Sequence, residues 1–135
     1  MQHPLIVTAG IIRRNDTILI TRRPDDSRQA GKWEFPGGKL EPGESPSTGL
    51  ARELAEELDL PVRVDGIFDV IYHRYDWGTI LLLVYECTPL ADQIRNLQVA
   101  EHRFVPAASL LEFDLLEADR PLVQRLIAEA ARPPI

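Results

Sequence analysis

Three glutamates within one helical turn are the residues of this sequence best suited to metal chemistry. Glu53, Glu56 and Glu57 stand three and four positions apart, which places their carboxylates on one face of a helix. Arg52 lies four residues before Glu56, but no cation lies four positions from Glu53 or Glu57. The carboxylates therefore repel one another unless something cationic sits beside them. Oxygen ligands without cysteine or clustered histidine favour Mg²⁺, with Mn²⁺ as a substitute, over zinc.

A solvated acidic helix face is the simpler interpretation of such a cluster, because these faces are common. The preceding residues favour a binding site instead. Gly37-Gly38-Lys39 is predicted to form a glycine-rich loop, in which backbone groups can approach a ligand closely, and Glu44 adds a further carboxylate. Metal ions held there could bridge phosphate oxygens and neutralise the charge on a phosphorus centre under attack.

The helix that must carry these glutamates has clear signals at both ends. Ser45 is a good N-cap, and Pro46 suits the first helical position because its missing N–H does no harm there. The apolar stripe consists of Leu50, Leu54 and Leu58 with Ala51 and Ala55. Asp59 can adopt a left-handed conformation and Pro61 cannot continue a helix, so the helix should end near Leu58.

The rest of the chain is predicted to supply a sheet and a second helix. The predicted strands cover residues 5–12, 17–21, 33–35, 62–75, 79–87 and 98–105, with a loop over 22–32, a hairpin turn at 76–78, a helical turn over 106–112 and a helix over 119–131. This order predicts an α/β fold with helices on both sides of a sheet. The length of 135 residues suits a single domain over 1–135.

Composition excludes several classes of function. The formal net charge is -6, which argues against an electrostatic grip on polymeric nucleic acid but allows a small phosphorylated substrate. Cys87 is the only cysteine, so neither an intrachain disulfide nor a cysteine metal site can form. No stretch approaches the roughly 20 apolar residues of a membrane helix, and the N-terminus lacks the pattern of a signal peptide. We therefore expect a cytoplasmic protein with no membrane partner.

The segment from Gly38 to Leu60 resembles the Nudix box. Gly38, five residues, Glu44, seven residues and then Arg52-Glu53-Leu54-Ala55-Glu56-Glu57-Leu58-Asp59-Leu60 match every defined position except Asp59, where the family usually has glycine. Aspartate tolerates the left-handed turn expected there at a free-energy cost of about 1 kcal/mol. The departure therefore affects local stability and leaves the chemistry intact.

The resemblance extends over nearly the whole chain, to the MutT-type branch that includes enzymes of oxidised dGTP and bacterial CTP pyrophosphohydrolases. It rests further on Thr21-Arg22-Arg23, on residues 34–39 and on Asp119-Arg120-Pro121. It implies a Nudix fold, in which a mixed β-sheet lies between helices and the box forms a loop-helix-loop motif. It also implies that water attacks a phosphorus of a nucleoside triphosphate and releases a nucleoside monophosphate and pyrophosphate.

The resemblance also implies roles for individual side chains. The implied metal ligands are the Gly37 carbonyl, Glu53, Glu56, Glu57 and, from outside the box, Glu101, on a loop beside His102. The general base is either Glu53 or Glu101, and the sequence does not separate the two; Glu101 could also be an ordinary surface residue. Arg52 and Glu44 are expected to hold the loop against the helix through a charge-assisted hydrogen bond.

Substrate contacts are implied for Arg23, Arg28, Glu34 and Phe35. The guanidinium of Arg23 suits a phosphate, although Arg23 could instead be an exposed residue beside Arg22. Arg28 lies where relatives contact the nucleotide but differs from them in residue type. Glu34 and Phe35 resemble the wall of a nucleoside pocket, while Phe35 could equally belong to the core. The aromatic residues without an assigned role are Trp33, Tyr72 and Trp77, any of which could stack on a base.

Asp119 bears on the choice of base. It could simply cap the last helix before Arg120-Pro121. In MutT-type enzymes the matching position contacts the base edge, with asparagine in bacterial enzymes of oxidised guanine and aspartate in CTP-hydrolysing relatives. An ionised carboxylate only accepts hydrogen bonds, so Asp119 suits an exocyclic amino group such as that of cytosine.

The leading hypothesis is thus a Mg²⁺-dependent pyrophosphohydrolase of a nucleoside triphosphate, either CTP-like or a modified or oxidised deoxynucleotide. One alternative is hydrolysis of another nucleoside diphosphate-linked compound. The other is a nucleotide sensor without catalysis, which would have no need of three crowded carboxylates. The protein is expected to act as a monomer or a homodimer.

Overall fold

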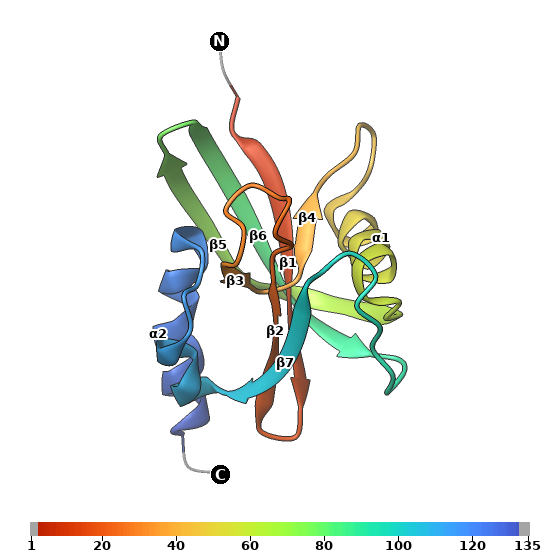
Figure 1. Cartoon of the computed structure of the whole chain (residues 1–135). Coiled ribbons are helices and arrows are strands. Elements are labelled where there is room, and N and C mark those ends of the chain that lie inside the picture. Colours follow the sequence, from red (N-terminus) through yellow and green to blue (C-terminus); the bar gives the residue numbers. More distant parts are fainter. Residues whose placement is uncertain (1–2, 133–135) are drawn as a thin grey trace.

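A seven-stranded mixed sheet runs through the part of the chain that the computed structural model describes, residues 3–132 (Figure 1). Its strands are β1 (Leu5–Arg14), β2 (Thr17–Arg22), β3 (Trp33–Glu34), β4 (Gly37–Lys39), β5 (Val62–Tyr75), β6 (Gly78–Pro89) and β7 (Glu101–Pro106). The strand order is β3-β2-β1-β6-β5, while β4 pairs with β1 and β7 with β2. Only the β1–β6 pair is parallel among these pairings.

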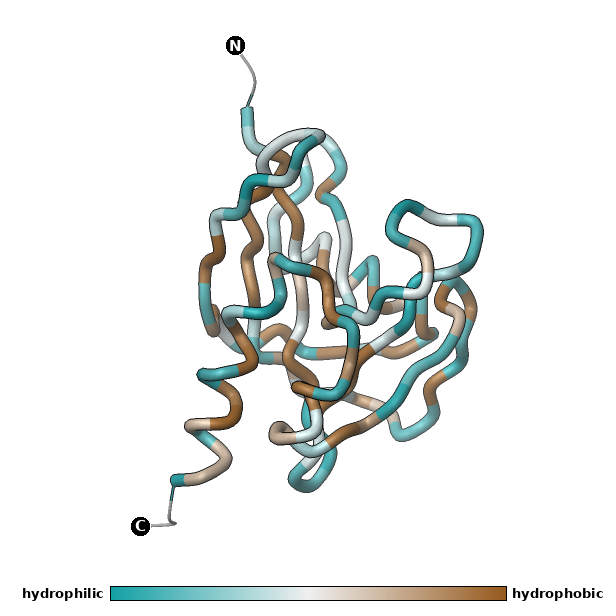
Figure 2. Tube along the Cα trace, turned by 60° about the vertical axis from the view of Figure 1, so that its left-hand side comes forward, coloured by the Kyte–Doolittle hydropathy of each residue, from teal (hydrophilic) through white to brown (hydrophobic). Residues whose placement is uncertain are grey.

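Two helices cover opposite sides of this sheet. Helix α1 (Pro46–Leu58) and helix α2 (Arg120–Ala130) lie on opposite sides in Figure 1, and two 3₁₀ turns, η1 (Ala107–Glu112) and η2 (Glu117–Asp119), lead into α2. Apolar and polar residues alternate along α2 in Figure 2, as expected for a helix with one buried face. The predicted α/β fold, a mixed sheet between helices, is confirmed.

Each helix buries its apolar stripe in a separate core. Leu50, Leu54 and Leu58 of α1 pack with Ile12, Leu19, Leu60 and Cys87. The α2 side chains Leu122, Val123 and Leu126 join the larger core on the other side of the sheet. Burial of a leucine side chain of this kind contributes about 2 kcal/mol, so the two cores fix both helices against the sheet. Cys87 is buried, as expected of a structural residue.

The two ends of α1 form as the sequence predicts. Ser45 has an extended conformation, and its hydroxyl oxygen accepts a hydrogen bond from the Thr48 amide at 3.4 Å. Asp59 is left-handed, with φ 52° and ψ 36°, and its amide donates to the Ala55 carbonyl at 3.0 Å. The helix is therefore fixed in length, which fixes the face that carries the glutamates.

Two predicted segments differ from the structure. Gly37–Lys39 is a short strand rather than a loop, because it pairs with β1 at the residues 7–9. A side chain at Gly37 would approach the Thr8 carbonyl oxygen to 2.0 Å, so only glycine allows this pairing. The last strand begins at Glu101 rather than at Gln98, since the Gln98 amide donates to the Glu57 carbonyl instead.

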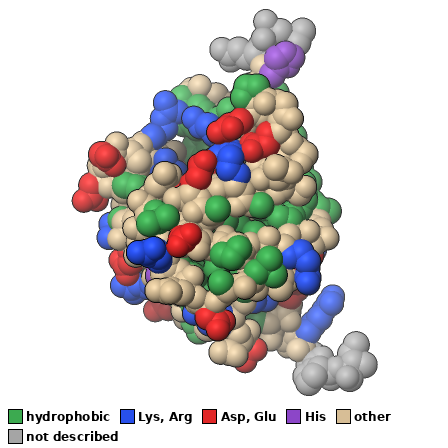
Figure 3. All heavy atoms as spheres, turned by 90° about the vertical axis from the view of Figure 1, so that its right-hand side faces the viewer, with side chains coloured by type: hydrophobic (Ala, Val, Ile, Leu, Met, Phe, Trp, Pro, Cys, Tyr) green, Lys and Arg blue, Asp and Glu red, His purple; other side chains and the backbone are tan. Residues whose placement is uncertain are grey.

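None of the described helices is both long and apolar enough to cross a membrane. On the face that Figure 3 shows, acidic and basic side chains are interspersed among apolar ones. Ion pairs between such neighbours keep the local charge small even though the net charge is -6.

Candidate active site

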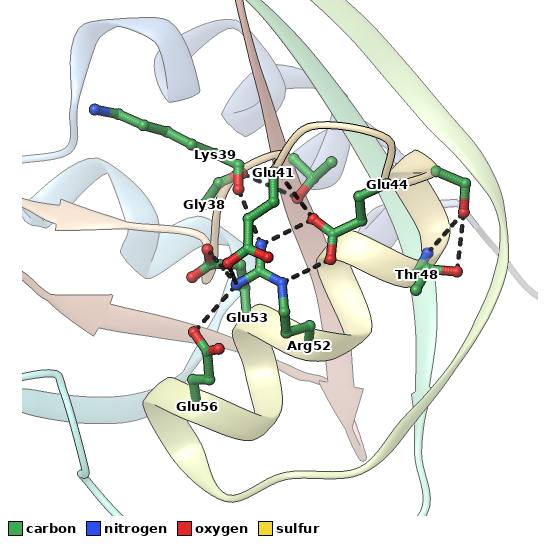
Figure 4. A network of polar contacts seen from close by, with 10 residues as sticks. Gly38, Lys39, Glu41, Glu44, Thr48, Arg52, Glu53 and Glu56 are labelled. Carbon is green, nitrogen blue, oxygen red and sulfur yellow. Dashed lines mark hydrogen bonds and ion pairs between the residues drawn. The ribbon is translucent and has the colours of Figure 1, made fainter.

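Arg52 is the centre of the polar network on α1 (Figure 4). Its Nε donates to Glu44 Oε2 at 2.6 Å, and its Nη2 donates to Glu44 Oε1 at 2.9 Å and to the Lys39 carbonyl at 3.2 Å. The Arg52 guanidinium holds the pKa of Glu44 at about 2. This bidentate pair joins the loop after β4 to the helix, as the sequence predicts for Arg52 and Glu44.

The same arginine also reaches two of the three candidate metal ligands. Arg52 Nη1 donates to Glu53 Oε1 and to Glu56 Oε2, each at 3.1 Å. The sequence predicts only the contact between Arg52 and Glu56, because these two residues lie four positions apart. Glu53 is reached as well because the guanidinium lies across the start of the acidic face (Figure 4).

Glu53 lies against the backbone of β4. A side-chain carbon placed on Gly38 would come within 2.5 Å of the Glu53 carboxyl carbon, so the missing side chain makes room for this carboxylate. The Gly38 carbonyl accepts a hydrogen bond from the Thr8 hydroxyl at 3.2 Å, which fixes the strand on its other side. Burial, more than any neighbouring charge, raises the pKa of Glu53.

Glu57 is half-buried on the next part of the same face. Burial, followed by the charges of Glu34 and Glu53, raises its pKa to about 9. Its own carbonyl accepts hydrogen bonds from the amides of Leu97 and Gln98 at 2.9 and 3.1 Å. A cation at this position would relieve the repulsion that raises the pKa.

The donor set of this face consists of carboxylate and carbonyl oxygens, which suits a hard dication. Within residues 3–132, no three Asp, Glu, His or Cys side chains converge closely enough to hold a metal ion as they stand. Arg52 accounts for part of this arrangement, since it turns Glu53 and Glu56 towards its own guanidinium. Binding of a dication would require these two carboxylates to turn away from Arg52.

A cavity of about 270 Å³ opens beside the acidic face. Its walls come from β1, β4, β6 and the segment before α2, and they include Leu5, Val7, Phe35, Gly37, Gly38, Ile80, Leu82 and Leu116. The walls are mainly apolar with a few polar groups, which is the usual character of a small-molecule site. Arg23, Arg28, Glu34 and Asp119 also line it, so the structure brings together all the predicted substrate residues.

Glu34 lines the cavity, and its charge is among those that raise the pKa of Glu57. Arg23 Nη1 lies 3.1 Å from Glu34 Oε2. Burial raises the pKa of Glu34 to about 7, against the opposing effect of Arg23. Arg23 is thus a partly buried residue of the cavity and not an exposed member of an arginine pair.

Asp119 does not cap α2, and that interpretation is wrong. Its side chain makes no capping hydrogen bond, and its Oδ2 instead accepts a hydrogen bond from the Phe35 amide at 3.1 Å. Asp119 is 4% exposed, and burial raises its pKa well above the usual value. Phe35 is 2% exposed and belongs to the core, and it also lines the cavity; its role in the wall of a nucleoside pocket stays a prediction.

Glu101 is the first residue of β7 and not part of a loop. Its two carboxylate oxygens accept hydrogen bonds from Arg22 Nε at 3.3 Å and Arg103 Nε at 2.5 Å. These partners lower the pKa of Glu101. Its carboxylate is therefore engaged by two arginines.

Several cavity residues have no prediction from the sequence. Leu5, Val7 and Ala9 of β1, and Ile80 and Leu82 of β6, alternate along their strands and all face the cavity or the core beneath it. In the sequence both strands read as nearly continuous apolar runs, so only the fold shows which of their side chains face the cavity. Among the unassigned aromatics, Trp77 lines the cavity, Trp33 is 8% exposed in the core and Tyr72 is 68% exposed.

Comparison with known families agrees with this geometry. The model of the family described as NUDIX domain matches residues 4–126. The chain therefore belongs to the Nudix family of hydrolases.

Individual relatives place the similarity within the MutT-type branch of the family. The chain is 41% identical over 131 residues to the CTP pyrophosphohydrolase of Escherichia coli K12, covering 94% of this chain and 95% of that protein. It is 40% identical over 91 residues to the 8-oxo-dGTP diphosphatase of Proteus vulgaris, covering 67% and 81%. The crystal structure of a MutT protein from Methanosarcina mazei superposes with a TM-score of 0.85 at 27% identity, covering 98% of this chain and 99% of that one.

Proposed function

We propose that this protein hydrolyses a nucleoside triphosphate to a nucleoside monophosphate and pyrophosphate. The observation that carries this proposal is the position of β4, whose Gly37 and Gly38 line the cavity while the Glu53 carboxylate of the acidic face lies against Gly38. A base in the cavity would place its phosphates towards that face. The names of the relatives from Escherichia coli and Proteus vulgaris support the same reaction.

The proposed cofactor is Mg²⁺, with Mn²⁺ as a substitute. Glu53, Glu56 and Glu57 with the Gly37 carbonyl would hold it, since they provide hard oxygen donors and a concentration of negative charge. Bound Mg²⁺ would neutralise the phosphate oxygens and lower the pKa of a water molecule. Glu101 is the additional ligand in this proposal and would have to exchange an arginine partner for the ion.

The remaining residues orient the substrate and the water. Arg23 presents a guanidinium at the cavity next to the acidic face, where a phosphate oxygen could accept two hydrogen bonds from it. Glu53 or Glu101 would accept the proton of the attacking water. Arg52 and Glu44 hold the loop and the helix together without touching the substrate in this scheme.

The proposed base is cytosine or a modified base with a similar edge. The N3 atom of cytosine accepts a hydrogen bond and its N4 amino group donates one. The ionised Asp119 carboxylate only accepts hydrogen bonds, so it can accept one from the N4 amino group, while the protonated carboxyl group of Glu34, whose pKa burial raises to about 7, can donate one to N3. The Phe35 amide fixes the orientation of the Asp119 carboxyl group.

Product analysis tests the proposal. The protein should be incubated with Mg²⁺ and a panel of ordinary, methylated and oxidised nucleoside triphosphates, nucleotide sugars and dinucleoside polyphosphates. Release of monophosphate and pyrophosphate from a triphosphate is expected. Orthophosphate would indicate a different bond, and turnover of a nucleotide sugar alone would favour the other diphosphate substrates.

The variant Glu57→Gln separates catalysis from binding. It removes a charge from the acidic face with little change in volume, so kcat should fall by at least roughly 100-fold while the fold is retained. Tight nucleotide binding by the wild type without turnover of any compound would favour the non-catalytic sensor.

A further inference from the structure

Two segments far apart in the sequence meet at the cavity through a side-chain pair. Arg28 belongs to the loop between β2 and β3, and Trp77 lies at the tip of the hairpin between β5 and β6. The Arg28 guanidinium carbon lies 4.7 Å from the centroid of the Trp77 ring, and both residues line the cavity. This geometry is that of a cation–π interaction.

Trp77 is braced on the hairpin side. Its ring stacks on Tyr75 with centroids 5.3 Å apart and an interplanar angle of 8°. The Tyr75 hydroxyl oxygen accepts a hydrogen bond from the Ala118 amide at 3.1 Å, next to Asp119. The indole is therefore held by a chain of contacts that leads to the base-contacting end of the cavity.

Arg28 is connected to the phosphate end. Its carbonyl oxygen accepts a hydrogen bond from Arg23 Nε at 2.6 Å. The same loop is closed by the Gly31 amide, which donates to the Arg23 carbonyl at 3.2 Å, and by the Lys32 amide, which donates to the Gln29 carbonyl at 3.2 Å. A shift of the Arg28 backbone would thus change the position of the Arg23 guanidinium.

We propose that Trp77 is a positioning residue that, together with Arg28, clasps the loop of residues 23–32 to the hairpin and holds the cavity in its substrate-binding shape. The indole already contacts a parallel ring and a guanidinium, so a base enters beside it rather than stacking on it. The clasp serves a nucleotide whose base enters the cavity lined by Phe35 and Leu82 while Arg23 contacts its phosphates. This inference rests on the proposed function for the identity of the substrate.

Steady-state kinetics of four single variants and one double variant test the clasp. An exposed cation–π pair corresponds to roughly a two- to fivefold change in an equilibrium constant. Trp77→Leu should therefore raise KM for the preferred triphosphate by about that factor and leave kcat near the wild-type value, while Trp77→Phe, which retains a π face, should restore KM towards normal. The matched control Tyr72→Leu alters an exposed aromatic of the same hairpin and should change neither constant.

The pair must also behave as a unit. Arg28→Gln should raise KM as Trp77→Leu does, and the double variant should be no worse than either single one. An unchanged KM in Trp77→Leu, a fall in kcat without a rise in KM, or additive effects in the double variant would each overturn the proposal.

A measurement without turnover separates the clasp from the proposed reaction. Amide hydrogen exchange of Gly31 and Lys32 in the nucleotide-free protein should be faster in Trp77→Leu than in the wild type and in Tyr72→Leu. If no triphosphate is hydrolysed, the proposed function fails but this comparison still decides the clasp. Equal exchange rates in the three proteins would rule the clasp out.

Discussion

Arg52 binds four carboxylates with one guanidinium, and two of these belong to candidate metal ligands. Glu44 contacts its Nε and Nη2, whereas Glu53, Glu56 and, at 3.5 Å, Glu41 contact its Nη1. A dication bound by Glu53 and Glu56 would replace only the Nη1 contacts and leave the pair with Glu44 intact. Arg52 would thus keep its structural contact with Glu44 and exchange its contacts with Glu53 and Glu56 when a dication binds.

The two candidate bases differ in their surroundings, and this predicts different effects of mutation. Both oxygens of Glu101 accept hydrogen bonds from arginines, whereas Arg52 reaches one oxygen of Glu53, whose carboxylate lies against the cavity residue Gly38. Glu53→Gln should lower kcat by roughly 10²- to 10⁴-fold, and Glu101→Gln by at least about tenfold less. Rates with saturating Mg²⁺ measure the difference. A larger loss in Glu101→Gln would transfer the role of base to Glu101.

The proposed base preference depends on Asp119, which lines the cavity. The amide of Asp119→Asn cannot ionise and always offers a donor, so it should lower kcat/KM for dCTP by roughly 10- to 100-fold relative to 8-oxo-dGTP. The ratio of the two kcat/KM values is the quantity to measure, because a general loss of activity cancels in it. A ratio equal to that of the wild type would show that Asp119 does not contact the base edge.

At the scale of the element, α1 ends at a residue whose backbone conformation is unfavourable for its side chain. Asp59 is left-handed, a conformation that glycine adopts without strain. Asp59→Gly should raise the free energy of unfolding by about 0.5–1 kcal/mol, since the ion pair with Arg95 is exposed and contributes little. Urea unfolding measures this change.

A matched substitution tests the reason for that gain. Asp59→Ala also removes the carboxylate but gives no relief in the left-handed region, so it should not stabilise the protein. Equal stabilisation by alanine and glycine would assign the effect to the lost charge. Neither change should alter kcat, because the residue lies outside the cavity lining.

The elements that the sequence predicts well are those with local signals. Both ends of α1 follow from Ser45 and Asp59, which act within one turn of the chain. The strand character of Gly37–Lys39 depends on β1, about 30 residues earlier, and no local residue indicates it. The start of β7 likewise depends on the Glu57 carbonyl, which takes the amide of Gln98 out of the ladder.

The same distinction applies to the candidate site. The glutamates and their arginine belong to one contiguous motif and could be identified from spacing alone. Asp119 has a sufficient local explanation as a helix cap, which is wrong because its carboxylate meets an amide 84 residues away. The clasp between Arg28 and Trp77 has no signal in the sequence, since only the fold brings the loop to the hairpin.

At the scale of the whole molecule, the ionised carboxylates of the site lower the free energy of unfolding as long as no cation neutralises them. Glu57 and Glu34 have pKa values raised to about 9 and about 7 from an ordinary value of 4.5. An acid with a raised folded-state pKa contributes stability that is complete below its unfolded-state pKa. That stability is lost as pH rises through the folded-state pKa. The metal-free protein should therefore be less stable at about pH 8.5 than at about pH 5.5.

Urea unfolding in the presence of a chelator measures this difference, and Glu57→Gln is the matched comparison. The variant lacks the carboxyl group whose pKa is raised further of the two, so its unfolding free energy should fall less between the two pH values. His102, whose pKa is lowered mainly by burial, acts in the opposite sense but equally in both proteins. Addition of Mg²⁺ should restore stability at about pH 8.5 in the wild type much more than in Glu57→Gln, because an ion that binds only the folded chain adds its binding free energy to folding. An identical pH dependence of the unfolding free energy in the two proteins would mean that Glu57 has no raised pKa in the folded chain. The argument for placing a dication beside it would then fail.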